Sequence, residues 1–317
     1  MSLHHWEIFY RNGAIATGPS QNNGNYDQEI LQAWLAFFES CPDNAKILDI
    51  ATGNGAVAII ASETSRKLGK HFDVHACDFA QINPLRDVPN AAERLAGITF
   101  HPGMAVENLT FDDAYFDAVS GQYALEYTDI PASLKQLHRT MKANGLAQFI
   151  IHHKNSILVR NTLINLDEAD FVLRKTKIYR RLKHLVSAQL VTPKFAENAG
   201  NQLRASIQSL KRALPEVQAA GGGMILQGTL DNIQKLLILR NESGPVASLE
   251  REINMAEKDL RFWVRRQVNL LNSAKDENGI AEIEHMATQT GFAVVSRELQ
   301  WHAGANLVGW KLVLRRI

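Results

Sequence analysis

Several kinds of residue and segment are scarce in this sequence, and each scarcity excludes a class of protein. Only Cys41 and Cys77 are cysteines, so neither a disulfide framework nor a Cys-rich zinc site is expected. No apolar run approaches the roughly 20 residues that cross a bilayer, and the first residues lack the basic and apolar regions of a secretory signal. We therefore expect a cytoplasmic protein without a membrane partner.

An excess of one charge is also missing. The chain has 34 Lys and Arg against 33 Asp and Glu, a formal charge of +1, so its overall electrostatics do not indicate a nucleic-acid partner. Paired-histidine, Cys-rich and P-loop signatures are absent, and we expect no bound metal. What is present is 317 residues with 45% hydrophobic content, which predicts one large domain or a domain that carries an insertion.

The first half of the chain alternates short apolar runs with helical patterns. Strands that alternate with helices form parallel sheets covered by helices on both faces, so this order predicts an α/β fold. The expected helices cover 56–68 and 134–141. The expected strands cover 46–50, 72–77, 97–101, 116–120 and 146–152.

From about residue 154 to residue 278 the pattern changes to one helix after another. This stretch holds 20 Lys and Arg against 13 Asp and Glu, a net charge of +7 that leaves −6 for the remainder. A helix at 281–291 and strands at 292–299 and 307–316 then follow. The predicted division is a core of residues 1–153 and 279–317 with a helical insertion at 154–278.

Three roles stay open for the insertion: a lid or substrate-binding subdomain, a dimerisation element, and a nucleic-acid platform. Dimerisation of two copies would use a heptad-like apolar seam formed by Leu249, Ile253, Ala256, Leu260, Trp263 and Leu270. Nucleic acid would use the basic run Arg174, Lys175, Lys177, Arg180, Arg181 and Lys183. A basic helical face is usually just solvated, and few aromatic residues are interleaved here, so nucleic acid is the least favoured partner.

One segment of the first half carries a pattern that indicates chemistry. A buried strand ends in Asp49, and a turn with Gly53 and Gly55 then enters a helix whose first N–H groups lack partners within the helix. Glycines without a Cβ let a ligand approach the backbone. Asp78 ends the next strand, where a carboxylate can accept hydrogen bonds from both hydroxyls of a ribose. Together these features predict a nucleoside-binding site.

This segment resembles motif I of the class I S-adenosylmethionine-dependent methyltransferases, with Ala51 in the place of the first glycine. Residues 78–82, 107–119 and 137–145 resemble further motifs of the family in the same order. The resemblance implies a Rossmann-like, doubly wound sheet of seven mostly parallel strands with an antiparallel last strand, and S-adenosylmethionine as cofactor. A carboxylate at Asp49 also suits a ligand with a cationic amino-acid tail and would repel the phosphates of a dinucleotide.

The resemblance also implies which residues hold the cofactor. The methionine part would lie on the motif I turn, the ribose on Asp78, and the adenine against apolar neighbours. In the family an acid often contacts the adenine amino group, but residues 104–106 here are Met-Ala-Val. The implied cofactor residues are Asp49, Ala51, Thr52, Gly53, Asn54, Gly55, Asp78, Phe79, Ile82, Met104, Ala105 and Gln122, with Tyr26 closing over the cofactor.

Tyr26 belongs to a segment, residues 1–40, that precedes the first strand and is rich in aromatic residues. In similar enzymes such a segment folds over the cofactor. The alternative is a helix at about 27–40 that packs in the core, preceded by a loose arm. For Trp34 through Phe38 this alternative is as well supported as a position over the cofactor.

Catalytic candidates follow the fourth and fifth strands, whose ends lie beside the cofactor in this fold. Methyl transfer needs an aligned nucleophile, and a general base only where the acceptor must lose a proton. His152 and His153 can accept protons near neutral pH, or one can pack while the other is solvated. Tyr127, like Tyr123, can form the pocket wall instead of a catalyst, and Glu126 can be a simple solvated residue.

Two absences narrow the substrate of the expected methyltransferase. No Asn- or Asp-Pro-Pro-aromatic motif follows the fourth strand, which disfavours methylation of exocyclic base amines, and no cysteine stands there to activate a pyrimidine. We therefore expect a small-molecule acceptor methylated on oxygen, nitrogen or carbon. The alternatives are a catalytically silent, cofactor-binding regulatory or scaffold protein and an RNA methyltransferase that uses the basic insertion.

Overall fold

The computed structural model describes residues 4–18, 24–188, 193–241 and 246–317, and it divides the chain into two compact units. Unit 1 comprises residues up to Val159 together with Asn269–Ile317, and unit 2 comprises Arg160–Val268. Parts of the segments predicted at 1–40 and 154–278 lie outside the described residues. The predicted boundaries at 153/154 and 278/279 remain a prediction.

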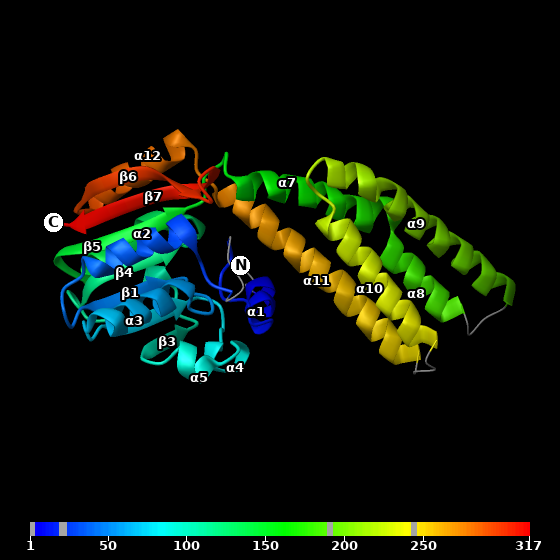
Figure 1. The fold of residues 1–317 in the computed structure, drawn as a ribbon, viewed down its shortest axis with the longest axis horizontal. Helices are drawn as coiled ribbons and strands as arrows, with labels where there is room; N and C mark the ends of the chain where they lie inside the picture. Colours follow the sequence, from blue (N-terminus) through cyan, green and yellow to red (C-terminus); the bar gives the residue numbers. More distant parts are fainter. Residues whose placement is uncertain (1–3, 19–23, 189–192, 242–245) are drawn as a thin grey trace. The chain divides into compact units, whose positions relative to one another are not determined.

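Unit 1 is built on one seven-stranded sheet with the strand order β3-β2-β1-β4-β5-β7-β6 (Figure 1). Strands β1 to β5 pair in parallel, whereas β7 pairs antiparallel with both β5 and β6. This confirms the predicted mostly parallel sheet with an antiparallel last strand. The strands are β1 (Lys46–Ile50), β2 (Asp73–Asp78), β3 (Ile98–Pro102), β4 (Phe116–Gln122), β5 (Met141–Ile151), β6 (Phe292–His302) and β7 (Asn306–Arg316).

Helices cover both faces of this sheet, and adjacent residues of one strand show why. Ile47 of β1 packs into one apolar cluster with α2 and α3, and Leu48 packs into another with α6 and α12. Because side chains alternate along a strand, a buried strand needs apolar residues at every position. The helices of unit 1 are α1 (His4–Arg11), α2 (Gln28–Glu39), α3 (Ala56–Leu68), α4 (Pro84–Asp87), α5 (Ala91–Arg94), α6 (Ile130–Thr140) and α12 (Glu277–Thr290), with short 3₁₀ turns η1 (Val106–Asn108) and η2 (Leu125–Tyr127).

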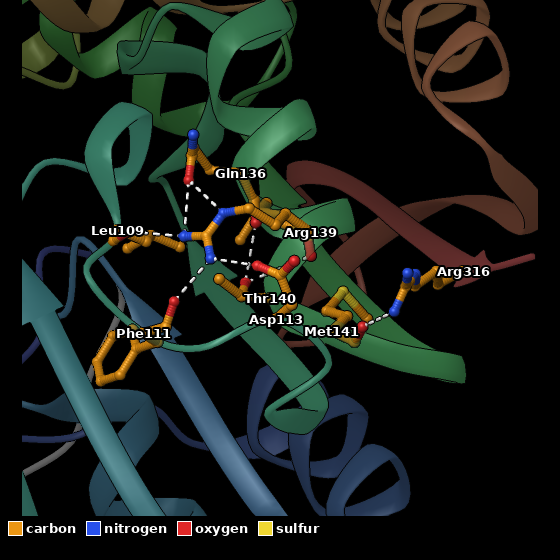
Figure 2. Close-up of polar contacts among 9 residues, drawn as sticks. Leu109, Phe111, Asp113, Gln136, Arg139, Thr140, Met141 and Arg316 are labelled. Atoms are coloured by element: carbon orange, nitrogen blue, oxygen red, sulfur yellow. Dashed lines mark hydrogen bonds and ion pairs between the residues drawn. The ribbon is translucent and has the colours of Figure 1, made fainter.

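Arg139 of α6 fixes the loop that leads into β4 (Figure 2). Its guanidinium donates to the carbonyl oxygens of Leu109 and Phe111 at 2.7 Å each and to a carboxylate oxygen of Asp113 at 2.8 Å. Gln136 accepts two more hydrogen bonds through its side-chain oxygen. A planar fork of donors can hold several acceptors at once, so this one residue joins two of the predicted motifs, 107–119 and 137–145.

Several element boundaries of unit 1 differ from the predictions, and the structure shows the reason for two of them. Strand β5 begins at Met141 and not at residue 146, because Met141 already pairs with Phe116 before a shift in register. Lys142 donates to both carboxylate oxygens of Asp117 at 2.8 Å beside that irregularity. Helix α12 begins at Glu277 and not at residue 281, because Asp276 caps it by accepting from Gly279 N–H at 2.9 Å.

Unit 2 is helical throughout its described residues, as its sequence pattern predicts. Its core includes Ile178, Leu182, Leu203 and Ile233 from three different helices. Helices α7 (Ile157–Asp170) and α11 (Val246–Ser273) cross its boundary with unit 1, and between them lie η3 (Phe171–Thr176), α8 (Ile178–Ala188), α9 (Pro193–Ala219) and α10 (Met224–Asn241). A turn at the glycine-rich residues 220–223 separates α9 from α10.

The apolar seam predicted on one long helix lies on α11. Leu249 and Ile253 are buried in the core of unit 2, and Ala256 and Leu260 pack partly against that core. This part of the seam therefore closes a bundle within the chain. Within the described ranges, no helix combines the length and hydropathy that a membrane crossing requires.

Candidate functional site

The turn between β1 and α3 bends through three left-handed residues. Gly53 and Gly55 have φ values of 56° and 90°, and Ala51 has a φ of 45°. Such values favour glycine because a Cβ crowds the backbone there. Ala51, which replaces a glycine of the related motif, therefore keeps the glycine conformation at a steric cost.

Asp49 lies under this turn at the end of β1, and only 1% of its surface is exposed. Its two carboxylate oxygens accept from Thr52 Oγ1 at 2.5 Å and Ser120 Oγ at 2.8 Å. Burial is the main reason why the pKa of Asp49 rises to about 7, and the nearby Asp78 adds to the rise. Since no Lys or Arg forms an ion pair with Asp49 in the described part of the chain, a bound cation would relieve this carboxylate.

Asp78 ends β2, and its carboxylate contacts the same turn. Its Oδ2 accepts from Gly53 N–H at 2.8 Å and its Oδ1 accepts from Ala80 N–H at 2.8 Å. Burial raises its pKa to about 6, although both hydrogen bonds act in the opposite direction. Each oxygen keeps a second acceptor position, so the carboxylate can still receive two hydroxyl groups.

Asn54 anchors the N-terminal arm to the turn. Its side-chain amide donates to the carbonyl oxygens of Tyr10 and Ala14 at 2.8 Å each, while its Oδ1 is buried without a partner. The Tyr10 ring lies against Gly53: a Cβ built on that glycine would come within 2.3 Å of the ring. No local sequence pattern predicts this contact, because helix α1 lies far from the motif along the chain.

The residues predicted beside adenine have different surroundings. Ile82 is buried in an apolar cluster with Tyr10 and Ala80, and Met104 and Ala105 are half-buried. Met104 N–H donates to Asp78 O at 2.9 Å, which ties residue 104 to the end of β2. Phe79 is 56% exposed, so in this structure its side chain is not part of the cluster.

Tyr26 is buried, with its hydroxyl 3.3 Å from Thr17 Oγ1. Burial raises the pKa of Tyr26 to about 12, and the charge of Asp49 adds a small part of the rise. Asn25 donates to Ala56 O at 3.0 Å and thereby attaches this part of the arm to the start of α3. Trp34 and Phe38 of α2 pack in the sheet core.

Gln122 ends β4 with its side-chain oxygen already engaged. Trp34 Nε1 donates to Gln122 Oε1 at 2.6 Å, and Gln122 Nε2 is buried without a partner. The next residue, Tyr123, has a φ of 52°, and its ring stacks on His152 with 3.9 Å between the centroids. Its hydroxyl donates to Val308 O at 3.3 Å. Tyr127 meets the His152 ring edge-on at 5.9 Å.

Glu126 and His152 lie together at the ends of β4 and β5. His152 N–H donates to Glu126 Oε1 at 2.8 Å, whereas Glu126 Oε2 and His152 Nδ1 are both buried without partners. Burial raises the pKa of Glu126 to about 7 and lowers that of His152 to about 3. The histidine is therefore neutral at physiological pH, and Glu126 is the member of this pair whose pKa lies near neutrality.

His153 is not brought into this group. Its Nδ1 accepts from Asn155 N–H at 2.8 Å, and its ring packs on Trp310 at 4.6 Å. Burial lowers its pKa from the ordinary value. The adjacent histidines, which follow the end of β5, thus have different surroundings.

Unpartnered buried atoms mark the edge of the sheet where these residues meet. The described residues hold seven such side-chain atoms, and four of them belong to Asn54, Gln122, Glu126 and His152. A buried polar atom without a partner is costly, so a cluster of them indicates a place for a polar ligand. Ser120 could have been found from the sequence, because parallel pairing sets it beside Asp49. No group of three His, Cys, Asp or Glu among the described residues could hold a metal.

Known proteins resemble this chain over its first half. Residues 47–145 match the family described as "Methyltransferase domain". A 2-phytyl-1,4-naphtoquinone methyltransferase of Nostoc punctiforme is 35% identical over 115 residues, which cover 34% of this chain and 47% of that protein. Its counterpart in Trichormus variabilis is 32% identical over 113 residues, covering 34% and 46%. The chain thus spans about half the length of the curated relatives it matches.

Solved structures of methyltransferases also align, at low identity. The 1,6-didemethyltoxoflavin-N1-methyltransferase of Burkholderia thailandensis has a TM-score of 0.43 and 11% identity, over 92% of this chain and 79% of that one. A protein of Galdieria sulphuraria described as a sarcosine dimethylglycine methyltransferase has a TM-score of 0.40 and 13% identity, over 99% and 98%. Residues 47–145 of this chain are thus similar to a methyltransferase domain, and they contain most of β1 and all of β2 to β4 of the seven-stranded sheet.

Proposed function

We propose that this chain binds S-adenosylmethionine at the carboxyl ends of β1, β2 and β4 and transfers its methyl group to a small-molecule acceptor. The observation that carries the proposal is the joint presence of two buried carboxylates without ion pairs and four unpartnered polar atoms at one sheet edge. The cofactor supplies an electrophilic methyl group on a sulfonium centre.

The residues fit this ligand in four places. Asp49 would bind the ammonium group of the methionine part. This cation would stabilise the ionised form of the buried carboxylate. Asp78 would accept from the ribose hydroxyls with the second acceptor position of each oxygen. Ile82, Met104 and Ala105 offer apolar surface to the adenine. The amide of Gln122 would donate to the methionine carboxylate through its unpartnered Nε2.

Glu126 and His152 would act on the acceptor. Glu126 can take a proton from an acceptor hydroxyl or amine, because its pKa of about 7 keeps part of it ionised at neutral pH. His152, held neutral by burial, can position the acceptor through Nδ1. His153 has no part in this proposal, since it packs on Trp310.

The acceptor itself is proposed from the aromatic lining. Tyr127, Tyr123 and His152 surround Glu126 with ring surface, which suits a planar small molecule. Since the curated relatives are named for a naphthoquinone, a quinol of that type is the first acceptor to assay. In the basic run of unit 2, Arg174 pairs with Asp170 and Lys183 with Glu257, so two of its six cations already have an acidic partner within the chain.

The test is calorimetry with S-adenosylhomocysteine, together with a methyl-release assay on quinols and other metabolites. Asp78→Ala should weaken binding by roughly 1.5–3 kcal/mol for each charged hydrogen bond lost, about 10- to 150-fold in affinity. Asp73→Ala, an exposed acid of the same strand, is the matched control and should bind normally. Unchanged affinity in Asp78→Ala would remove the ribose assignment, and binding without any turnover would favour a silent cofactor-binding protein.

The role of unit 2 is a second part of the proposal. We place it as a lid or substrate-binding subdomain, because Leu249 and Ile253 of the apolar seam are used within the chain and are therefore not available to join two copies. Analytical ultracentrifugation checks this, and a stable dimer that Leu260→Glu breaks would assign the seam to dimerisation instead.

A further inference from the structure

The contact between Tyr10 and Gly53 fills the space that a glycine in such a turn keeps open. A Cβ on Gly53 would lie 2.3 Å from Cε1, 2.4 Å from Cζ and 2.6 Å from the hydroxyl oxygen of Tyr10. Real Cβ atoms do not approach other atoms this closely, so the phenol ring rests directly on the glycine backbone. In a ligand-binding turn that close approach belongs to the ligand.

The other neighbours of the Tyr10 ring are the residues expected beside the nucleoside. Tyr10 is 7% exposed and forms an apolar cluster with Ala80 and Ile82, against which Trp6 and Phe9 pack partly. Gly53 donates to Asp78, so the ring also lies next to the proposed ribose carboxylate. Tyr10 and an adenosine therefore compete for one volume.

We propose that residues 4–16 form a displaceable plug: in the ligand-free protein Tyr10 occupies the adenosine site, and the cofactor must expel it to bind. This proposal rests on the proposed function, because it takes adenosine as the competing group. It differs from a segment that closes over bound cofactor, since the plug leaves the crevice when the ligand enters.

Asn54 is the latch of this plug. Its amide donates to Tyr10 O and Ala14 O at 2.8 Å, and both acceptors belong to the arm. When the arm leaves, two donors of a fully buried side chain become available in the cofactor turn, next to its unpartnered Oδ1. The same residue would therefore hold the arm in one state and the ligand in the other, which makes the two states mutually exclusive.

Only molecules in which the plug is open can bind the cofactor. The apparent affinity is therefore the intrinsic affinity multiplied by the fraction of open molecules. Removing the ring should therefore tighten binding without adding any contact to the ligand. Removing only the hydroxyl should not, because the ring alone fills the space against Gly53.

The experiment compares the wild type, Tyr10→Ala and Tyr10→Phe in calorimetric titrations with S-adenosylhomocysteine. Tyr10→Ala should bind at least about fivefold tighter, and Tyr10→Phe should bind like the wild type. Hydrogen exchange of the wild type gives a second readout that needs no variant. Amides of residues 5–13 should exchange faster when the protein is saturated with S-adenosylhomocysteine.

The other possible results decide on the plug and on the proposed function. Weaker or equal binding by Tyr10→Ala, or slower exchange of residues 5–13 on saturation, overturns the plug while leaving the cofactor assignment intact. Binding by neither the wild type nor Tyr10→Ala overturns the proposed function and the plug with it. Binding by Tyr10→Ala alone supports both.

Discussion

Two buried glutamates, one in each compact unit, differ in how their oxygens are used. Glu168 of unit 2 is 3% exposed and accepts from Gly223 N–H at 2.6 Å, Ile225 N–H at 3.0 Å and Leu226 N–H at 2.9 Å. Glu126 of unit 1 is 5% exposed, accepts one backbone hydrogen bond and leaves Oε2 without a partner.

The difference separates a carboxylate that accepts hydrogen bonds at a helix start from one that we propose acts on the acceptor. Glu168 accepts hydrogen bonds from the N–H groups at the start of α10, which have no partner within the helix. The helix dipole also favours a negative charge there. Glu126 Oε2 has no such donor, so its burial costs folding free energy. A hydrogen bond from a bound acceptor would offset that cost. Substitutions at the two positions should therefore affect different properties.

Glu126→Gln should have the largest effect, and on the rate of methyl transfer. The amide oxygen can still accept from His152 N–H, but the side chain can no longer take a proton, so turnover should fall about 10²- to 10⁴-fold. Steady-state kinetics measure this, with S-adenosylhomocysteine affinity as the check on the site. Glu282→Gln on the exposed face of α12 is the control. Full turnover in Glu126→Gln would remove the residue from catalysis.

Glu168→Ala should act on stability instead. It leaves three N–H groups at the start of α10 without their acceptor, which costs roughly 3 kcal/mol in the free energy of unfolding. Urea denaturation measures the loss, and Asp167→Ala, the exposed neighbour on the same helix, should cost little. Affinity for S-adenosylhomocysteine should stay unchanged, because the cofactor residues lie in unit 1. A stable Glu168→Ala protein would contradict the structural role.

The pH dependence of stability should show the same contrast. Burial raises the pKa of Asp49 and Glu126 to about 7 and that of Asp78 to about 6, all above their ordinary values. The folded protein therefore holds protons that the unfolded chain releases, so this stabilisation is present at low pH and is lost as pH rises through about 6 to 7.

Thermal unfolding of the ligand-free protein at pH 5 and pH 8 tests this. The wild type should be less stable at pH 8, and Glu126→Gln should lose at least about 1 kcal/mol of that difference because it has no proton to release. An equal pH dependence in the two proteins would show that Glu126 titrates normally.

Ala51→Gly should have the smallest effect, a gain in stability of less than about 1 kcal/mol. Glycine relieves the left-handed strain at φ 45°, and the greater freedom of the unfolded chain offsets part of the gain. Ala281→Gly on the exposed surface of α12 should have the opposite sign, a loss of about 1 kcal/mol. Denaturation curves of both variants decide the point, and a destabilised Ala51→Gly would mean that the alanine methyl packs usefully.

The sequence predicted the elements whose pattern is local. Helix α3 covers 56–68 as expected, because a glycine turn starts it and Gly69 ends it. Strands such as β1 and β4 were found because buried strands of a parallel sheet are rich in apolar residues at successive positions. The start of β5 was missed because register with β4, and not the local pattern of residues 141–145, decides it.

The site residues that belong to one local motif were predictable from the sequence. Those that the fold brings together from distant segments were not. Asp49 and Asp78 follow from their positions at strand ends. The environments of His152 and His153 could not be predicted from two adjacent positions in the sequence. Burial lowers the pKa of His152 to about 3, whereas the His153 ring packs on Trp310. Tyr10 could not be predicted either, because its contact with Gly53 joins segments about forty residues apart, a distance that no local pattern spans.

A crystal structure of the full chain with S-adenosylhomocysteine tests the central claim most directly. We expect the ribose hydroxyls to donate to Asp78 and the amino group to lie beside Asp49. Tyr10 should be displaced from Gly53. A ligand bound elsewhere, or a crevice in which Tyr10 remains against Gly53 at saturating ligand, would contradict it.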